Sequence, residues 1–556
     1  LQPCNNLIFF EKNFSKFFSK KFFLKIFFQK FSPKFSKINK FFFNNSKLSS
    51  IKIYSGFNIK LLSFVTAAVI SLGSCSKEYL DVEPKGTNLE SNYYQNQEQA
   101  FAGLVAVYDI MRKNSGGFEN MITMMNAGSD DHYAGGGGAT DGAGIQGFSN
   151  YTINANIMPS SLWNDHYQGI FRANYLLTKL ASVPMDAALI DRYTAETKAL
   201  RANYYFNLVR MFKNIPLITV PMSSSEFYTV VQANPTAVYA QIEKDLTEAI
   251  TNLPATVSAA ESARFTKGAA RALLGKVYLY QNKNSQAAAE LAAVNGTPGG
   301  TSQYGYRLLA NFADLWTVNN KFNTESILEV AHTNASSIGW ENWGNGVDEG
   351  NSTNVMCGPR TYSKIASDAP DLPSGWSFNV FTQDFYDFIK LDPRFAATVL
   401  DMKDLQTRGK ASYIGGYQDT GYFLNKFIPR RSDVTTGTGE PVLNYRQNSY
   451  VIRLADSYLM EAEALGGTGA RAQALLDAVR ARVGLASTPV SLAAIKAERR
   501  AELAGEGHRF FDLVRWGDAA TKLASRGFKA GKNEVFPIPY KELLNTKLVQ
   551  NPGYNQ

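Results

Sequence analysis

The chain alternates strongly periodic helical segments with glycine-rich loops. Apolar residues recur at spacings of three and four, which place them on one face of an α-helix. Four such series are Leu200, Tyr204, Leu208 and Met211; Val238, Ile242, Leu246 and Ile250; Leu273, Val277 and Tyr280; and Leu454, Tyr458, Ala462 and Leu465. Pro216 and Pro254 follow the first two series and end those helices. No comparable series of alternating strand positions occurs, so the pattern predicts a mainly α protein.

One of these helices carries a short repeat motif. Leu274-Gly275-Lys276-Val277-Tyr278 matches the L-G-x-x-Y core of a tetratricopeptide helix, where Gly lets a partner helix approach closely and Tyr fills the gap beside it. Residues 450–466 and 470–482 have the right lengths for a second helix pair. A clean period of about 34 residues is absent. We therefore expect diverged, tetratricopeptide-like helix pairs.

The segment 285–450 has a different composition. Gly, Asn, Ser and Thr dominate it, helical periodicity weakens, and three of the six Trp residues fall among its loop residues: Trp340, Trp343 and Trp376. A second loop, residues 128–138, ends in four glycines. We interpret this run as a flexible surface loop and not a phosphate cradle, because no strand precedes it and no G-K-S/T follows. Loops on a rigid scaffold concentrate binding residues.

Residues 60–75 have the parts of a secretory signal peptide. Lys60 precedes the apolar run Leu61–Leu72, and Gly73-Ser74-Cys75 follows. Leu72-Gly73-Ser74-Cys75 resembles the lipobox of bacterial lipoproteins, in which the cysteine is acylated and becomes the N-terminus. An ordinary secretory signal and a short buried helix are the alternatives. Twelve residues are too few to span a bilayer, which takes about 20. We expect residues 51–75 to be a lipoprotein signal peptide and Cys75 to carry lipid.

The sequence upstream of this signal is of another kind. Residues 1–50 contain 14 Phe and 10 Lys with a single acidic residue, Glu11, and the first Met of the chain is Met111. Phe, Lys, Asn and Ile are what A- and T-rich DNA encodes whether or not it is a gene. We expect residues 1–50 to be a non-native upstream extension of the reading frame. The alternative is a basic, aromatic leader that lies on a membrane.

This leader also supplies the positive charge. The whole chain carries +9, but residues 1–75 contain 12 Lys and one Glu and so account for +11, which leaves −2 for residues 76–556. A basic surface for nucleic acid is therefore not expected in the exported protein. Of the three cysteines, Cys4 and Cys75 belong to the leader, so only Cys357 remains as a thiol. A disulfide framework is excluded within one mature chain.

The C-terminal part carries a family signature. Residues 497–517 read A-E-R-R-A-E-L-A-G-E-G-H-R-F-F-D-L-V-R-W-G, which resembles the E-R-R-x-E-L-x-x-E-G-x-R-x-x-D-L-x-R-W motif of SusD/RagB proteins. Further matches are residues 80–82, 199–206, 267–270, 453–459, 536–539 and 550–554. The charged residues of the motif alternate in sign between Leu503, Phe510 and Trp516, so we interpret them as structural salt bridges and not as a catalytic site.

The resemblance implies a SusD-like nutrient-binding domain over residues 76–556, with a helical scaffold and a loop-rich ligand-binding lobe. Such proteins are lipid-anchored at the cell surface of the Bacteroidetes outer membrane. They cap a SusC-like TonB-dependent transporter and capture nutrients, most often glycans, for import. The resemblance implies no catalysis, and neither a cofactor nor a metal site is indicated by the residues, since no carboxylate cluster has calcium-loop spacing.

A sugar-binding site needs aromatic rings that stack on the apolar C–H faces of the sugar. It also needs a few polar groups that form hydrogen bonds with the sugar hydroxyls. We predict that Trp340, Trp343 and Trp376 form the platform and that Asp131, His132 and Tyr133 are their polar partners. Two other functions stay open. A surface glycoside hydrolase needs two carboxylates across the bond, and Asp130 and Asp131 are the only conspicuous loop pair. A tetratricopeptide scaffold for peptides would need several regular repeats.

Overall fold

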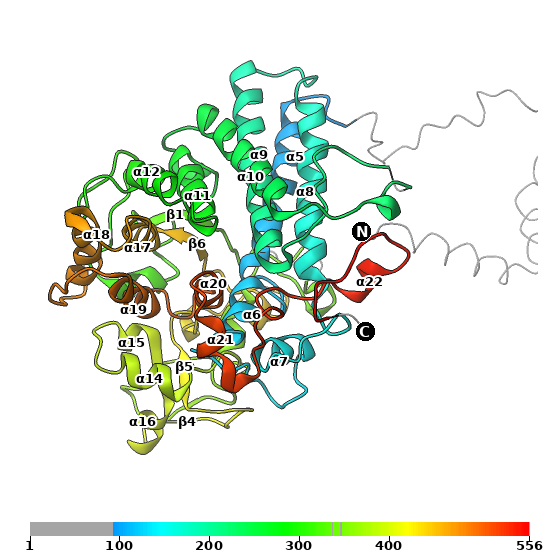
Figure 1. Cartoon of the computed structure of the whole chain (residues 1–556). Coiled ribbons are helices and arrows are strands. Elements are labelled where there is room, and N and C mark those ends of the chain that lie inside the picture. Colours follow the sequence, from blue (N-terminus) through cyan, green and yellow to red (C-terminus); the bar gives the residue numbers. More distant parts are fainter. Residues whose placement is uncertain (1–92, 224, 336, 345–346, 555–556) are drawn as a thin grey trace, which may run out of the picture. The chain divides into compact units, whose positions relative to one another are not determined.

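The computed structural model describes residues 93–223, 225–335, 337–344 and 347–554 (Figure 1). Residues 94–556 group into one compact unit, and the statements below concern its described part. The predicted upstream extension (1–50), the signal peptide (51–75) and Cys75 lie outside the described residues.

The element bounds are as follows. The α-helices are α5 (Gln97–Tyr108), α6 (Met121–Ala127), α7 (Ala143–Ser149), α8 (Ser161–Leu180), α9 (Ala187–Phe212), α10 (Pro235–Asn252), α11 (Lys267–Tyr280), α12 (Asn284–Asn295), α13 (Ser352–Cys357), α14 (Gln383–Ile389), α15 (Phe395–Thr398), α16 (Met402–Thr407), α17 (Leu454–Ala464), α18 (Gly469–Arg482), α19 (Leu492–Glu502), α20 (Arg509–Arg515), α21 (Ala519–Lys522) and α22 (Tyr540–Leu543). The 3-10 helices are η3 (Asp109–Asn114), η4 (Phe227–Thr229), η5 (Ala259–Glu261), η6 (Phe312–Trp316), η7 (Trp340–Asn342), η8 (Arg431–Asp433), η9 (Pro441–Leu443) and η10 (Ala524–Arg526). The strands are β1 (Ser326–Val330), β2 (Ser363–Lys364), β3 (Val399–Asp401), β4 (Ala411–Ser412), β5 (Tyr422–Leu424) and β6 (Ser449–Arg453).

The long helices form the scaffold. Each of them packs on the next in the order α8, α9, α10, α11, α12, α17 and α18, and α5 packs on α8 and α9 (Figure 1). Helix α9 ends before Pro216 and α10 ends before Pro254, as the sequence predicts. Among the described residues the strands are short and occur in three two-stranded sheets. The predicted mainly α class is confirmed. None of the described helices is long and apolar enough to cross a membrane.

The glycine of the repeat motif sits where α11 and α12 pack together. A Cβ atom added to Gly275 would lie 2.6 Å from Cγ of Leu291 on α12, so only glycine allows this separation of the two helices. Thr266 caps the N-terminus of α11 by accepting a hydrogen bond from the N–H of Ala269. The motif therefore marks a close helix pair, as the sequence predicts.

The predicted helix at residues 450–466 is wrong in its first turn. Residues 449–453 form β6, which pairs antiparallel with β1, and α17 begins only at Leu454. Tyr450, Val451 and Ile452 are residue types that favour strands. Their pairing partner is separated from them by more than a hundred residues of sequence, so the helical spacing alone could not reveal it.

A second, loop-rich lobe contains α14, α15, α16 and the short sheets β2–β4 and β3–β5 (lower part of Figure 1). It has its own buried apolar cluster, which includes Phe381, Phe385, Ile389, Phe423 and Leu424. The free thiol of Cys357 is buried in this cluster, and burial raises its pKa. The predicted loop-rich lobe is therefore present, and Cys357 is an inert core residue.

The charged signature motif is structural. The carboxylate of Glu502 is fully buried and pairs with Arg453, Arg394 and Arg482, the Arg394 contact being 2.9 Å. Arg499 likewise bridges Asp456 at 2.7 Å and Asp512 at 2.9 Å. Burial alone would raise the pKa of Glu502, but the three guanidinium groups outweigh it and hold that pKa well below its usual value. The motif ties the helical scaffold to the loop-rich lobe.

Candidate functional site

The three loop tryptophans lie together. The rings of Trp340 and Trp376 are stacked, with centroids 6.0 Å apart and planes at 22°. The ring of Trp343 stands nearly perpendicular to both, at 5.8 Å from Trp340 and 5.5 Å from Trp376. The ring of Phe118 packs edge to face against that of Trp343, with centroids 6.0 Å apart. Two loops that are distant in sequence thus form one aromatic cluster.

Hydrogen bonds fix two of the three rings in place. The indole N–H of Trp340 donates to the Glu440 carboxylate at 3.1 Å, and that of Trp343 donates to Oγ of Ser352 at 3.0 Å. Trp340 remains 51% exposed, while Trp343 and Trp376 are half-buried. The cluster therefore exposes an apolar surface of fixed orientation to solvent. Stacking against the apolar face of a ligand requires such a surface.

Close backbone packing positions Trp376. Its backbone N–H donates to the Val355 carbonyl at 2.9 Å, and that of Ser377 donates to the Gly358 carbonyl at 2.8 Å. A Cβ atom added to Gly375 would lie 2.4 Å from Cα of Gly358. The two facing glycines let the backbone segments at Gly358 and Gly375 come into contact. This contact fixes the position of the backbone that carries Trp376.

Polar groups that the sequence did not single out surround the cluster. Glu440 holds Trp340, and one guanidinium nitrogen of Arg360 donates to the Trp376 carbonyl at 3.0 Å. The same nitrogen lies 3.9 Å from the carboxylate of Asp141, and both side chains are more than a third exposed. Carboxylate and guanidinium groups beside exposed rings suit the hydroxyls of a sugar. In the sequence, only the loop-like composition around these polar residues could have indicated them.

Asp131 and His132, which the sequence placed among the ligand-binding residues, lie inside the protein. Each is 1% exposed. Asp131 accepts a hydrogen bond from Arg500 at 2.7 Å, and Nδ1 of His132 donates to the Asn379 carbonyl at 2.8 Å. Tyr133 is partly exposed and lies under the guanidinium of Arg526, 4.5 Å from its ring centroid. Asp131 and His132 thus support the loop, and in the described part of the chain none of the three side chains contacts a tryptophan ring.

The first half of the glycine run after them is packed, contrary to the expectation of a flexible loop, whereas Gly137 is exposed and a Cβ atom added to Gly138 would meet nothing within 4 Å. Gly135 pairs with Phe378 as an isolated bridge, and a Cβ atom added to it would lie 2.2 Å from the Ser377 carbonyl oxygen. Gly136 accommodates the Phe378 ring in the same way, at 2.4 Å. The run therefore holds the segment that carries Trp376, because only residues without side chains allow the two backbones to approach so closely.

The pair Asp130 and Asp131 does not have the character of a glycosidase pair. Arg509 binds both oxygens of Asp130 at 2.8 Å, and Arg500 binds Asp131. Burial raises the pKa of Asp131, whereas the hydrogen bond and charge of Arg509 outweigh burial and lower the pKa of Asp130. Both carboxylates are used in ion pairs that join this loop to α19 and α20.

The burial of His132 predicts a pH dependence of stability. Burial lowers its pKa from 6.5 to about 3, so between these two pH values the folded state binds fewer protons than the unfolded state. The stability that this group contributes is complete above pH 6.5 and is lost as the pH falls toward 3. We expect the thermal midpoint of the native protein to fall more steeply between pH 7 and pH 5 than that of His132→Phe, which can still pack on Phe381. Parallel curves would contradict this assignment.

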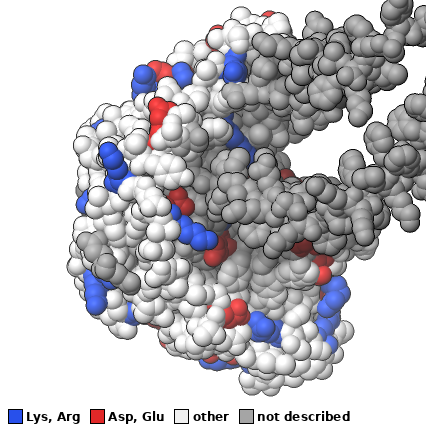
Figure 2. Space-filling model, turned by 90° about the vertical axis from the view of Figure 1, so that its right-hand side faces the viewer, with Lys and Arg blue, Asp and Glu red and all other residues white. Residues whose placement is uncertain are grey.

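Charge on the surface is mixed. Figure 2 shows acidic and basic side chains scattered among uncharged residues on the face in view. This distribution agrees with the balance of −2 for residues 76–556 and suits a neutral ligand better than a polyanion.

Two sequence families match the chain. "SusD family" covers residues 324–526, and "Starch-binding associating with outer membrane" covers residues 78–279. A solved laminarin-binding SusD-like protein is 71% identical, with a TM-score of 0.82 over 83% of this chain and 100% of that one. The chain belongs to the SusD family. The resemblance drawn from the C-terminal motif is thereby confirmed.

Other SusD-family relatives are more distant. Surface glycan-binding protein A from Bacteroides fluxus is 27% identical, with a TM-score of 0.72 over 83% of this chain and 100% of that one. SusD-like protein P25 of Formosa agariphila is 26% identical over 542 residues, which are 88% of this chain and 97% of that protein. The names of the two solved structures describe the binding of laminarin and of surface glycans.

Proposed function

We propose that this protein is a noncatalytic, cell-surface glycan-binding lipoprotein whose ligand is a laminarin-type glucan. The tryptophan cluster carries the proposal, because it presents one half-exposed ring and two supporting rings with a carboxylate and a guanidinium close by. The 71% identity to a laminarin-binding SusD-like protein supports the choice of glycan. Trp340, Trp343 and Trp376 form the platform, and Glu440, Arg360 and Asp141 are the polar partners.

Calorimetry with a matched set of oligosaccharides tests this function. Laminarihexaose should bind, while cellohexaose and maltohexaose, which have the same sugar units in other linkages, should bind more weakly. Laminarihexaose recovered after long incubation should be intact. Shorter products would favour the glycoside hydrolase, and a failure of all three sugars to bind would reject the proposal.

The proposed anchor is the lipid on Cys75. One acyl chain gives only marginal membrane binding, and two or more give a stable anchor at about 0.8 kcal/mol per buried CH₂. We expect mass spectrometry of the native protein to find an N-terminal acylated Cys75 and no peptide from residues 1–50. The Cys75→Ser variant should leave the membrane fraction. An unmodified Cys75 in the native protein would contradict this prediction.

The proposed partner is a SusC-like TonB-dependent transporter to which the captured glycan is delivered. Holding a weakly bound ligand beside the pore raises its effective concentration there, so a modest affinity is sufficient. We expect the native lipoprotein, extracted gently in detergent, to co-purify with a TonB-dependent β-barrel. Recovery of the lipoprotein alone in repeated gentle extractions would reject the delivery role and leave glycan binding unaffected.

A further inference from the structure

A polar cavity lies inside the helical scaffold, and its lining residues belong to other segments than the tryptophan cluster. Its volume is about 50 Å³, and η3, α6, α9, α11, β6 and the start of α20 contribute to its wall. One water needs roughly 10–15 Å³ of such space. The cavity therefore has room for several water-sized atoms.

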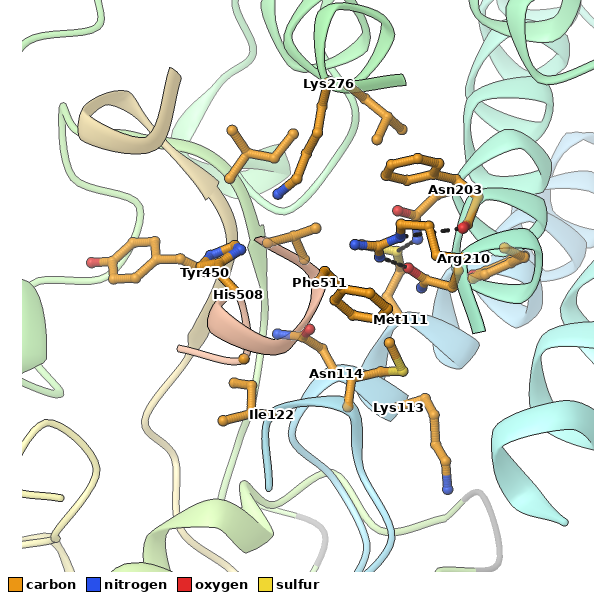
Figure 3. Close-up of a pocket in the computed structure, with 18 of the residues that line it drawn as sticks. Met111, Lys113, Asn114, Ile122, Asn203, Arg210, Lys276, Tyr450, His508 and Phe511 are labelled. Atoms are coloured by element: carbon orange, nitrogen blue, oxygen red, sulfur yellow. Dashed lines mark hydrogen bonds between the residues drawn. The ribbon is translucent and has the colours of Figure 1, made fainter. Parts of the chain in front are cut away.

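Three nitrogen-bearing side chains point into this space from different elements (Figure 3). They are Lys276 from α11, Arg210 from α9 and His508, which precedes α20. Lys113, which also lines the cavity, points away from its centre and pairs with Asp165 at 3.4 Å. The carboxylate of Glu506 also lines the cavity, but Lys426 and Arg453 bind it at 2.8 Å and 2.9 Å. The three nitrogen-bearing side chains are therefore suited to a guest that accepts hydrogen bonds.

The imidazole of His508 has unused hydrogen-bonding capacity. No hydrogen bond joins either ring nitrogen to another of the described residues. Burial lowers its pKa to about 4, so the ring is neutral near pH 7 and one of its nitrogens carries a proton. His508 is half-buried, and its N–H group, which has no protein partner, faces the cavity, where an acceptor would satisfy it.

One cationic side chain at the cavity has no carboxylate partner among the described residues. In the described part of the chain, Lys276, Arg499 and Arg515 are matched by the carboxylates of Asp456, Asp512 and Glu463. Arg210 has no carboxylate within ion-pair distance among the described residues. Its guanidinium is held instead by the carbonyl of Phe206, by Oδ1 of Asn207 and by Tyr280.

Aromatic rings enclose Arg210 without neutralising it. Its guanidinium carbon lies 4.2 Å from the ring centroids of both Phe206 and Phe511. These contacts attract a cation, but they also shield part of the half-buried Arg210 from water, and an uncompensated charge in such a place is costly. A counter-charge in the adjoining cavity would relieve this cost.

We propose that this cavity binds a chloride ion between Lys276, Arg210 and His508. The ion balances the charge of Arg210 and accepts the hydrogen bond that the His508 ring can donate. Its position at the meeting point of α9, α11 and the segment before α20 makes it a structural ion that joins the scaffold to the C-terminal motif.

Crystals of the unaltered protein soaked in sodium bromide test the site directly. Bromide scatters anomalously and replaces chloride, so a single anomalous peak is expected in the cavity, in contact with Lys276, Arg210 and His508. Electron density for water without an anomalous peak there would overturn the proposal.

A second test compares stability in sodium chloride and sodium gluconate at equal ionic strength. A ligand that binds only the folded state stabilises it, and a rise of roughly 1–2 °C in the thermal midpoint is expected in chloride. Lys276→Met should lose this rise, while Lys522→Met, an exposed control on α21, should keep it. Equal midpoints of the unaltered protein in the two salts would contradict the proposal. If Lys276→Met does not fold, the bromide experiment decides alone.

Discussion

Replacing Trp340 and Trp376 together by Ala is expected to weaken the binding of laminarihexaose about 100-fold. These two rings form the stacked pair of the cluster, at 6.0 Å and 22°, and Trp340 is its most exposed member. Stacking contributes about 0.5–1.5 kcal/mol per ring beyond the buried area. About 1.4 kcal/mol corresponds to a tenfold change in affinity, so the upper part of this range, together with the apolar area that each ring buries, gives roughly one factor of ten per ring.

Calorimetry on the single and double variants measures this effect. Trp340→Ala alone should lose about tenfold in affinity, and Trp340→Phe should lose less because a smaller ring remains. Tyr540→Ala is the matched control, since Tyr540 is also 51% exposed but belongs to α22. A folded double variant with native affinity would remove the cluster from the binding site.

The scaffold could be predicted from local sequence patterns. The helical spacings of α9, α10 and α11 lie within each segment, and so do the prolines that follow α9 and α10. The start of α17 could not be predicted in this way, because the strand before it, β6, forms only through its pairing with β1. A short apolar run has no property of its own that separates a strand from a first helical turn.

The site was predictable in part. Three tryptophans among loop residues indicated an aromatic platform, and the structure brings their rings within 6.0 Å of one another. Their role in binding stays a prediction. The burial of Asp131 was not predictable, because Arg500, its ion-pair partner, lies 369 positions later in the chain. The positions of Arg360 and Glu440 likewise follow from the fold of separate loops and not from any local motif.

Replacing Glu502 by Gln is expected to lower the free energy of unfolding by about 3–5 kcal/mol, the usual effect of breaking a buried ion pair. The carboxylate of Glu502 is fully buried and serves three guanidinium groups at once. Gln keeps the shape of the side chain but removes its charge, so Arg453, Arg394 and Arg482 would share one carboxylate fewer. Thermal and denaturant unfolding of the native and variant proteins measure the difference.

The position of Glu502 makes a further consequence testable in the same experiment. Arg453 ends β6 and Arg482 ends α18 in the scaffold, whereas Arg394 precedes α15 in the loop-rich lobe. Loss of the shared carboxylate should therefore weaken the connection between the two parts, and the variant should unfold in a broader or a two-step transition. Asp387→Asn, which breaks the exposed pair with Lys390, should leave the midpoint nearly unchanged, because water screens that pair. Equal shifts for the two variants would show that the buried network does not hold the lobes together.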